Sequence, residues 1–187
     1  PAPRTIYESV YKLEPGYLLE VSLKENFKIN KKCFWDIKNI YLKGKKTLFK
    51  GTENEAKEIS REMLENSVKK QLISDVPIGA FLSGGIDSST ITALMKKITN
   101  SQIKTFTIGF DEEDFSEAHQ ASLIAKYIGT DHNELIITHK DLLNVMPSIS
   151  SIHDEPFADS SQIPTYFVSK LAKEKVTVAL TGDGGDE

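Results

Sequence analysis

Between Thr52 and Pro77 the apolar residues recur every three or four positions, which predicts a long amphipathic helix. Thr52 and Glu55 have the spacing of a capping box, so the helix is expected to begin there. The apolar positions are Ile59, Met63, Leu64, Val68 and Leu72. The run at 78–82 that follows is short and almost wholly apolar, as is typical of a buried strand.

The same alternation of strand and helix patterns continues to residue 181. Helical spacing returns with Ile91, Leu94, Met95 and Ile98 after a turn at 83–88. Further strands are expected at 104–110, 133–138 and 175–181, and further helices at 116–130, 140–152 and 163–174. The helix at 116–130 is predicted to start at a Ser116 cap and to end near Gly129, and Pro147 should kink the next one. This order predicts an α/β fold with a doubly wound parallel sheet and ligands at the carboxyl ends of its strands.

Residues 1–50 have a different pattern. "GYLLEVSL" at 16–23 reads as a strand after a Pro-Gly turn, and "CFWDI" at 33–37 adds aromatic residues without helical period. We therefore expect a β-rich edge and linker over 1–50 and a separate domain over 51–187. Because the chain starts without Met and stops inside a loop, we expect it to be a piece of a longer protein.

Composition and charge narrow the classes of function. The formal net charge is −4, so a nucleic-acid partner is not expected, and lysines 31, 32, 43, 45 and 46 are interpreted as a solvated linker. A single cysteine, Cys33, excludes an internal disulfide and a multi-cysteine metal site, which suits a cytoplasmic protein. No apolar run is long enough to span a membrane. The four histidines show no metal-binding spacing.

The turn after the strand at 78–82 carries the strongest chemical signal. Its glycines allow backbone N–H groups to approach an anion, and the N-terminus of the following helix adds partial positive charge. Its polar and glycine positions are Ser83, Gly84, Gly85, Asp87, Ser88 and Ser89. A carboxylate at Asp87 would repel a phosphate unless a cation stood between them, so the pattern predicts Mg²⁺. The alternative is a tight turn whose serines only cap the helix.

A second loop, "TGDGGDE" at 181–187, follows the last expected strand. It should therefore emerge at the same edge of the sheet, where its carboxylates would face the same ligand. These are Asp183, Asp186 and Glu187.

The first turn is not a Walker A loop, because no lysine occurs between Val76 and Met95, and it lacks the GxGxxG of a dinucleotide-binding turn.

The turn resembles instead the SGGxDS PP-loop of ATP pyrophosphatases, which have the adenine nucleotide alpha hydrolase-like (HUP) fold. "VPIGAFLSGGIDSS", "TFTIGF", "DEPFADSS" and "TGDGGDE" occur here in the order and spacing of glutamine-hydrolysing asparagine synthetases. That resemblance covers residues 53–187. Residues 1–50 resemble the end of the family's N-terminal glutaminase domain and its linker.

The resemblance implies that the side-chain carboxylate of aspartate is adenylated by ATP with release of pyrophosphate, and that ammonia made from glutamine in the glutaminase domain then gives asparagine. By matching positions, pyrophosphate would be held by Ser83, Gly84, Gly85, Asp87, Ser88 and Ser89. The adenosine pocket would be formed around Phe81, Leu82, Ile108, Thr181 and Gly182. Mg²⁺ would be bound by Asp87 and Asp186. Asp183 stands where many members have glutamate near the reacting carbonyl and, with Asp87, is the expected catalytic carboxylate.

Departures from the family keep alternatives open. The glutaminase nucleophile and the catalytic lysine are absent from the chain, so little activity is expected of it alone. "FADSSQIPTY" lacks the arginine that would engage the α-carboxylate of aspartate, so sugar-amidating or β-lactam-forming relatives remain alternatives. Other PP-loop enzymes, such as NAD or GMP synthetases, and a non-catalytic nucleotide-binding module are further alternatives. Whether the protein is a homodimer stays open.

Overall fold

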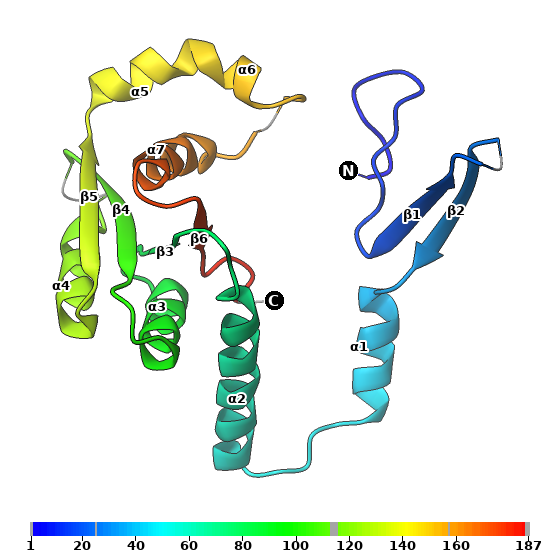
Figure 1. Ribbon diagram of the computed structural model, residues 1–187, viewed down its shortest axis with the longest axis horizontal. Helices are drawn as coiled ribbons and strands as arrows, with labels where there is room; N and C mark the ends of the chain where they lie inside the picture. Colours follow the sequence, from blue (N-terminus) through cyan, green and yellow to red (C-terminus); the bar gives the residue numbers. More distant parts are fainter. Residues whose placement is uncertain (1, 25, 113–115, 157, 186–187) are drawn as a thin grey trace. The chain divides into compact units, whose positions relative to one another are not determined.

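The computed structural model describes residues 2–24, 26–112, 116–156 and 158–185. The chain divides into two compact units, Pro1–Thr52 and Glu53–Glu187 (Figure 1). In the first unit, β1 (Tyr17–Ser22) and β2 (Lys28–Cys33) form an antiparallel pair, and α1 (Ile37–Lys46) follows. The strand expected at 16–23 is therefore present.

The expectation of a β-rich edge and linker over 1–50 did not include the helix α1, which begins inside the segment 33–37 that showed no helical period. Asp36 is the N-cap of α1, and its side chain accepts a hydrogen bond from the Lys38 N–H at 3.0 Å. Apolar residues at Ile37, Ile40 and Tyr41 have helical spacing but stay exposed. The lysines and Gly44 between them obscured this short pattern in the sequence, and the Asp36 cap was the available signal.

The second unit is built around a four-stranded sheet in the order β5-β4-β3-β6, with every neighbouring pair parallel. Its strands are β3 (Ile78–Phe81), β4 (Lys104–Phe110), β5 (Asp131–Ile137) and β6 (Val178–Leu180). Its helices are α2 (Glu53–Gln71), α3 (Ile86–Ile98), α4 (Ala118–Ile128), α5 (His139–Val145), α6 (Ile149–Ile152) and α7 (Gln162–Lys173). Between α5 and α6 the chain forms a 3-10 turn, η2 (Met146–Ser148), at the proline predicted to kink it.

Successive residues of β3 pack on opposite faces of the sheet. Ala80 packs in a buried cluster with Leu94 and Met95 of α3, whereas Phe81 packs against a cluster that includes Phe106 and, from α7, Ala172. Helices therefore cover both faces (Figure 1). The predicted α/β fold with a doubly wound parallel sheet is confirmed.

The strand order places a crevice at the carboxyl edge. From β3 the chain runs outward through β4 to β5, and it then returns to place β6 on the other side of β3. In sheets of this kind, the loops that leave the two strands at the point of reversal diverge and form the ligand site. The loops that begin at Leu82 and Thr181 are therefore in the expected position.

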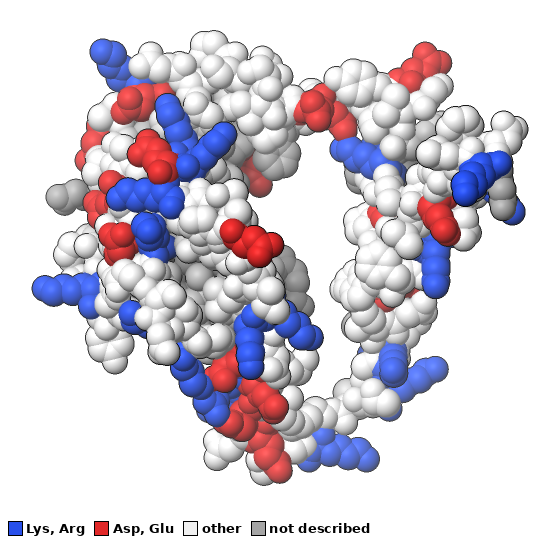
Figure 2. Space-filling model, viewed as in Figure 1, with Lys and Arg blue, Asp and Glu red and all other residues white. Residues whose placement is uncertain are grey.

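Charged side chains of both signs are interspersed over the visible face of this unit (Figure 2). Ion pairs join elements as well as residues of one helix: Lys97 of α3 pairs with Glu65 of α2. Exposed pairs of this kind stabilise a fold by less than about 1 kcal/mol each. None of the helices that the structure describes is both long and apolar enough to cross a membrane.

Gly79 of β3 has no room for a side chain beside β4. A Cβ atom at this position would lie 2.7 Å from Cε2 of Phe106 and 2.8 Å from the Lys104 carbonyl oxygen. Gly79→Ala is expected to lower the free energy of unfolding by about 1–2 kcal/mol, because the neighbouring backbone cannot move away cheaply. Urea denaturation measures this, with Gly44→Ala as control, since a Cβ there meets no atom within 4 Å. Equal losses in the two variants would contradict the packing argument.

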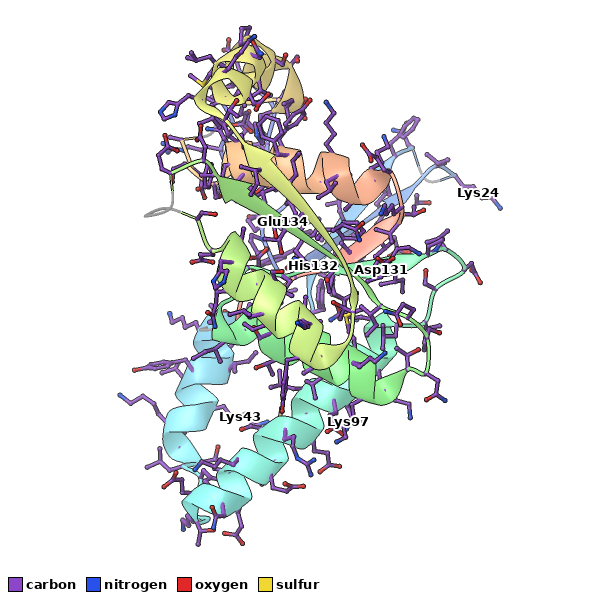
Figure 3. All side chains as sticks on the ribbon, turned by 90° about the vertical axis from the view of Figure 1, so that its left-hand side faces the viewer. Lys24, Lys43, Lys97, Asp131, His132 and Glu134 are labelled. Carbon is purple, nitrogen blue, oxygen red and sulfur yellow. The ribbon has the colours of Figure 1, made fainter. Side chains whose placement is uncertain are left out.

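His132 lies near the start of β5, away from the carboxyl edge (Figure 3). Its Nδ1 lies 2.9 Å from Oγ1 of Thr105, and its Nε2 is buried without a hydrogen-bond partner among the described residues. Burial lowers the pKa of the imidazole below its ordinary value near 6.5, and the carboxylate of Glu134, 3.9 Å from Nε2, opposes this effect. The folded protein therefore holds His132 neutral where an unfolded chain would begin to bind a proton.

The free energy of unfolding of wild type, relative to that of His132→Asn, should decrease as the pH falls from 7 to 5. Below pH 6.5 the unfolded wild-type chain takes up a proton that the folded one resists, which costs at most about 1.4 kcal/mol per pH unit. Asparagine retains a polar atom toward Thr105 but does not titrate. Both proteins are unfolded with urea at each pH. Subtracting their free energies of unfolding removes the contributions of the carboxylates, which the two proteins share. A difference that is constant with pH would contradict the lowered pKa.

Candidate functional site

The turn between β3 and α3 requires glycine at one position and forms an uncapped helix start at the next. Gly84 has φ +86°, a conformation that L side chains rarely adopt, and a Cβ there would lie 3.2 Å from the Ala121 nitrogen of α4. Gly85 is the N-cap of α3 and supplies no side-chain cap. The first backbone N–H groups of α3 are therefore available to an anion at the carboxyl edge.

The serine hydroxyls of this turn bond to each other and to one carbonyl group. Oγ of Ser83 lies 3.0 Å from Oγ of Ser88, which also accepts the Ser83 N–H at 3.2 Å. Ser89 donates to the Gly85 carbonyl oxygen at 2.6 Å. Oγ of Ser83 also accepts a hydrogen bond from the N–H of Gly85, the N-cap residue, at 3.4 Å, but none of these bonds reaches an N–H within α3, so capping alone does not account for the three serines.

The second loop packs directly on the first. A Cβ atom at Gly182 would lie 2.6 Å from the Ser88 nitrogen, and one at Gly185 would lie 2.9 Å from Oδ1 of Asp87. Position 182 must therefore lack a side chain for the loops to come together, whereas a Cβ atom at position 185 would meet the movable carboxylate of Asp87. The missing Cβ at Gly185 also leaves space beside the Asp87 carboxylate.

The two loops border a cavity of about 520 Å³ at the carboxyl edge of the sheet. Of the residues predicted to form the site, ten line it: Phe81, Leu82, Ser83, Gly85, Asp87, Ser88, Ile108, Thr181, Gly182 and Asp183. Gly84 and Ser89 belong to the same turn but are not among the lining residues. Asp186 and Glu187, expected at the same loop, lie outside the described residues.

Seven further residues line this cavity that sequence reasoning missed. They are Phe106, Thr107 and Phe110 of β4, Glu117 before α4, and Pro164, Thr165 and Val168 of α7. They belong to β4 itself, to the segment that follows it, or to α7, which packs against the sheet. Glu117 could have been found from the sequence, because it follows a predicted strand. The residues of α7 could not, because the sequence does not show which helix covers the cavity.

Comparison with known proteins places the chain in a family. The family described as asparagine synthase matches residues 60–187, which is more than half of the chain. The chain belongs to the asparagine synthase family.

Individual members of the asparagine synthase family align over the whole chain. A Methanocaldococcus jannaschii protein, whose name assigns it to the glutamine-hydrolyzing asparagine synthetases, is 40% identical and is covered over 35% of its length. Asparagine synthetase [glutamine-hydrolyzing] 1 of Bacillus subtilis is 37% identical and is covered over 28%. The chain thus spans about a third of the length of these relatives. A Campylobacter jejuni NH3-dependent NAD synthetase aligns over 64% of this chain and 53% of its own at 14% identity, with a TM-score of 0.46, too distant to bear on function.

The oxygen donors at the carboxyl edge of the sheet suit a hard cation. Asp87 and Asp183 both line the cavity and offer carboxylates, the ligand type that Mg²⁺ prefers together with phosphate oxygens. The space left by Gly185 beside Oδ1 of Asp87 lets a cation approach that oxygen without a side chain in its way. The described residues therefore fit the magnesium ion expected from the sequence.

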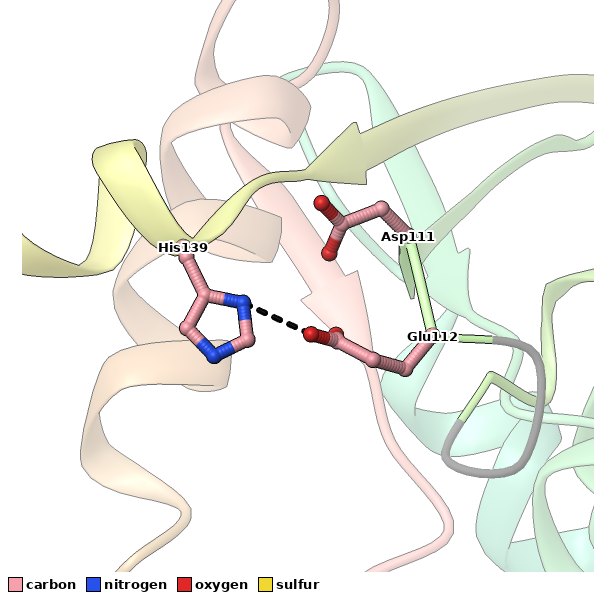
Figure 4. Close-up of side chains that lie close together, drawn as sticks. All are labelled: Asp111, Glu112 and His139. Atoms are coloured by element: carbon pink, nitrogen blue, oxygen red, sulfur yellow. Dashed lines mark ion pairs between the residues drawn. The ribbon is translucent and has the colours of Figure 1, made fainter.

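A separate group of potential ligands lies at the ends of β4 and β5. One donor atom from each of Asp111, Glu112 and His139 lies within 4.8 Å of the other two (Figure 4). The Glu112 carboxylate is already paired with Nδ1 of His139 at 2.6 Å, and Asp111 and His139 are exposed. An ion pair on the surface accounts for this arrangement, so it is not counted with the site.

Proposed function

We propose that the chain forms the ATP-binding part of an asparagine synthetase, which adenylates the side-chain carboxylate of aspartate and releases pyrophosphate. The observation that carries this proposal is the contact between the turn at 82–89 and the loop at 181–185 at one sheet edge, around a cavity. Membership of the family supports the reaction class. Glutamine-derived ammonia would come from a glutaminase domain, and the protein would act in the cytoplasm.

The first step needs the β- and γ-phosphates of ATP to be held while the α-phosphate is attacked. A carboxylate oxygen of aspartate forms a bond to the α-phosphorus, and the bond from that phosphorus to the bridging oxygen breaks. The N–H groups at the start of α3 and the hydroxyls of Ser83 and Ser88 would bind the leaving pyrophosphate. Their present bonds to each other keep these hydroxyls in position until phosphate oxygens replace them.

The carboxylates would control charge in the same step. A magnesium ion bound by Asp87, and by Asp186, would neutralise the phosphate oxygens. Asp183 lines the same cavity and would lie beside the reacting carbonyl. In the second step ammonia attacks that carbonyl carbon, the bond to AMP breaks and a proton is lost, for which a carboxylate is a suitable acceptor.

Acceptor-dependent exchange of labelled pyrophosphate into ATP tests this function. The full-length protein that contains the chain is incubated with Mg²⁺, ATP and one acid at a time: aspartate, glutamate, a sugar acid or a β-amino acid. Exchange that requires aspartate is expected. Exchange with another acid alone would assign the protein to a different amide ligase. Tight Mg·ATP binding without exchange for any acid would contradict ligase activity and favour a nucleotide-binding module.

A further inference from the structure

Glu117 occupies a fixed place in the wall of the cavity. Ser116, before it, accepts a hydrogen bond from the Phe110 N–H at 3.3 Å. Ala118, after it, is buried, and a Cβ atom at Gly109 would lie 2.7 Å from the Ala118 Cβ. Both neighbours of Glu117 are thus held against the end of β4, so the backbone that carries its carboxylate is well positioned.

The first turn of α4 extends from the end of β4 to the phosphate-binding turn. At its far end, Gln120 and Ala121 lie against Gly84, with 3.2 Å from the Ala121 nitrogen to a Cβ at that glycine. At its near end, Glu117 lines the cavity together with Ile108 and Phe110 of β4. Glu117 therefore lies between the expected phosphate position and the apolar wall of β4.

The charge of Glu117 suits hydroxyl groups better than phosphates. The residues that line the described part of the cavity include no lysine or arginine, so no basic side chain there neutralises this carboxylate. Apart from Asp87 and Asp183, which belong to the expected magnesium site, it is the acidic residue of the wall. In a nucleotide whose phosphates occupy the turn and whose base faces the apolar wall, the group between them is the ribose, and carboxylates accept hydrogen bonds from ribose hydroxyls.

We propose that Glu117 accepts a hydrogen bond from a ribose hydroxyl of the bound nucleotide and thereby selects ribonucleotides over deoxyribonucleotides. This assignment rests on the proposed function, because it takes the cavity to be the ATP site. It gives a specificity role to a residue outside the two loops that were recognised from the sequence.

Binding of ATP, 2′-deoxy-ATP and 3′-deoxy-ATP tests the assignment. The affinities are measured by calorimetry in the presence of Mg²⁺ for wild type, Glu117→Ala, Glu117→Gln and the control Glu112→Ala, which removes a nearby acidic residue outside the cavity. Wild type and the control should bind ATP roughly 10-fold or more tightly than at least one deoxy analogue, as expected for a hydrogen bond to a charged group. Glu117→Ala should bind ATP and that analogue equally, and Glu117→Gln, which keeps an acceptor oxygen, should retain part of the preference.

Three results would overturn the assignment while leaving the ATP site in place. Glu117→Ala could bind all three nucleotides as wild type does, or it could weaken all three by the same factor, which would indicate a structural role for the residue. The third result uses a fourth nucleotide, purine riboside triphosphate, which lacks the adenine amino group. Wild type could bind this analogue more weakly than ATP and bind the deoxy analogues as well as ATP. If Glu117→Ala removed that preference, Glu117 would contact the base and not the ribose. If wild type bound none of these nucleotides, the proposed function would fail together with the assignment.

Discussion

Replacing Asp87 by asparagine is expected to weaken Mg·ATP binding by roughly 100-fold, because a charged ligand to the cation contributes about 2–3 kcal/mol. Without Mg²⁺ the order should reverse, so that Asp87→Asn binds ATP at least as well as wild type. The carboxylate then faces the phosphates with no cation between them. Calorimetric titration with ATP in the presence of Mg²⁺ and of a chelator measures both effects.

The control for this experiment is Asp75→Asn. Asp75 is exposed in the connection before β3 and is not among the residues that line the cavity, so this variant changes the net charge equally without touching the site. Unchanged Mg·ATP affinity in Asp87→Asn would show that Asp87 is not a magnesium ligand. An equal loss in both variants would indicate a general effect of charge.

Gly182→Ala is expected to reduce ATP affinity by about 100-fold or more. A Cβ there would lie 2.6 Å from the Ser88 nitrogen and 2.9 Å from the Asp87 carbonyl carbon, both of which are backbone atoms. The added methyl group must therefore push the two loops apart, and crowding of this kind costs about 1–3 kcal/mol. The separation would also displace the N–H groups that start α3 from the phosphate position.

Urea denaturation beside the ATP titration separates damage to the site from loss of the fold. Gly182→Ala should remain folded, with a free energy of unfolding lowered by about 1–3 kcal/mol. Gly44→Ala is the matched control and should leave ATP affinity unchanged, because its Cβ meets no atom within 4 Å. Wild-type affinity in a folded Gly182→Ala protein would mean that contact between the loops does not form the binding site.

The sequence was most informative where local pattern and global topology agree. The strand predicted at 104–110 coincides with β4, and the helix expected to end near Gly129 does so, with Gly129 in the left-handed conformation at φ +77°. Alternation of strands and helices was enough to predict that the turn at 83–88 and the loop at 181–187 would meet. Both follow parallel strands, and β3 and β6 are neighbours.

What could not be predicted depended on contacts between distant segments. Ser116 was expected to cap α4, but the helix begins at Ala118, and the Ser116 hydroxyl bonds to the end of β4 instead. That choice is decided by the packing of α4 on β4 rather than by the helix itself. The contribution of α7 to the cavity wall, through Thr165 and Val168, likewise follows from which face of the sheet the helix covers.

The most direct test of the account identifies which bond of ATP is broken. The full-length protein is supplied with Mg²⁺, ATP, aspartate and ammonium, and the phosphorus products are followed by ³¹P NMR while asparagine is quantified by chromatography. AMP and pyrophosphate should accumulate in equal amounts, one of each per asparagine formed. Accumulation of ADP and phosphate would place cleavage at the γ-phosphate and contradict a pyrophosphate site at the contact between the turn at 82–89 and the loop at 181–185.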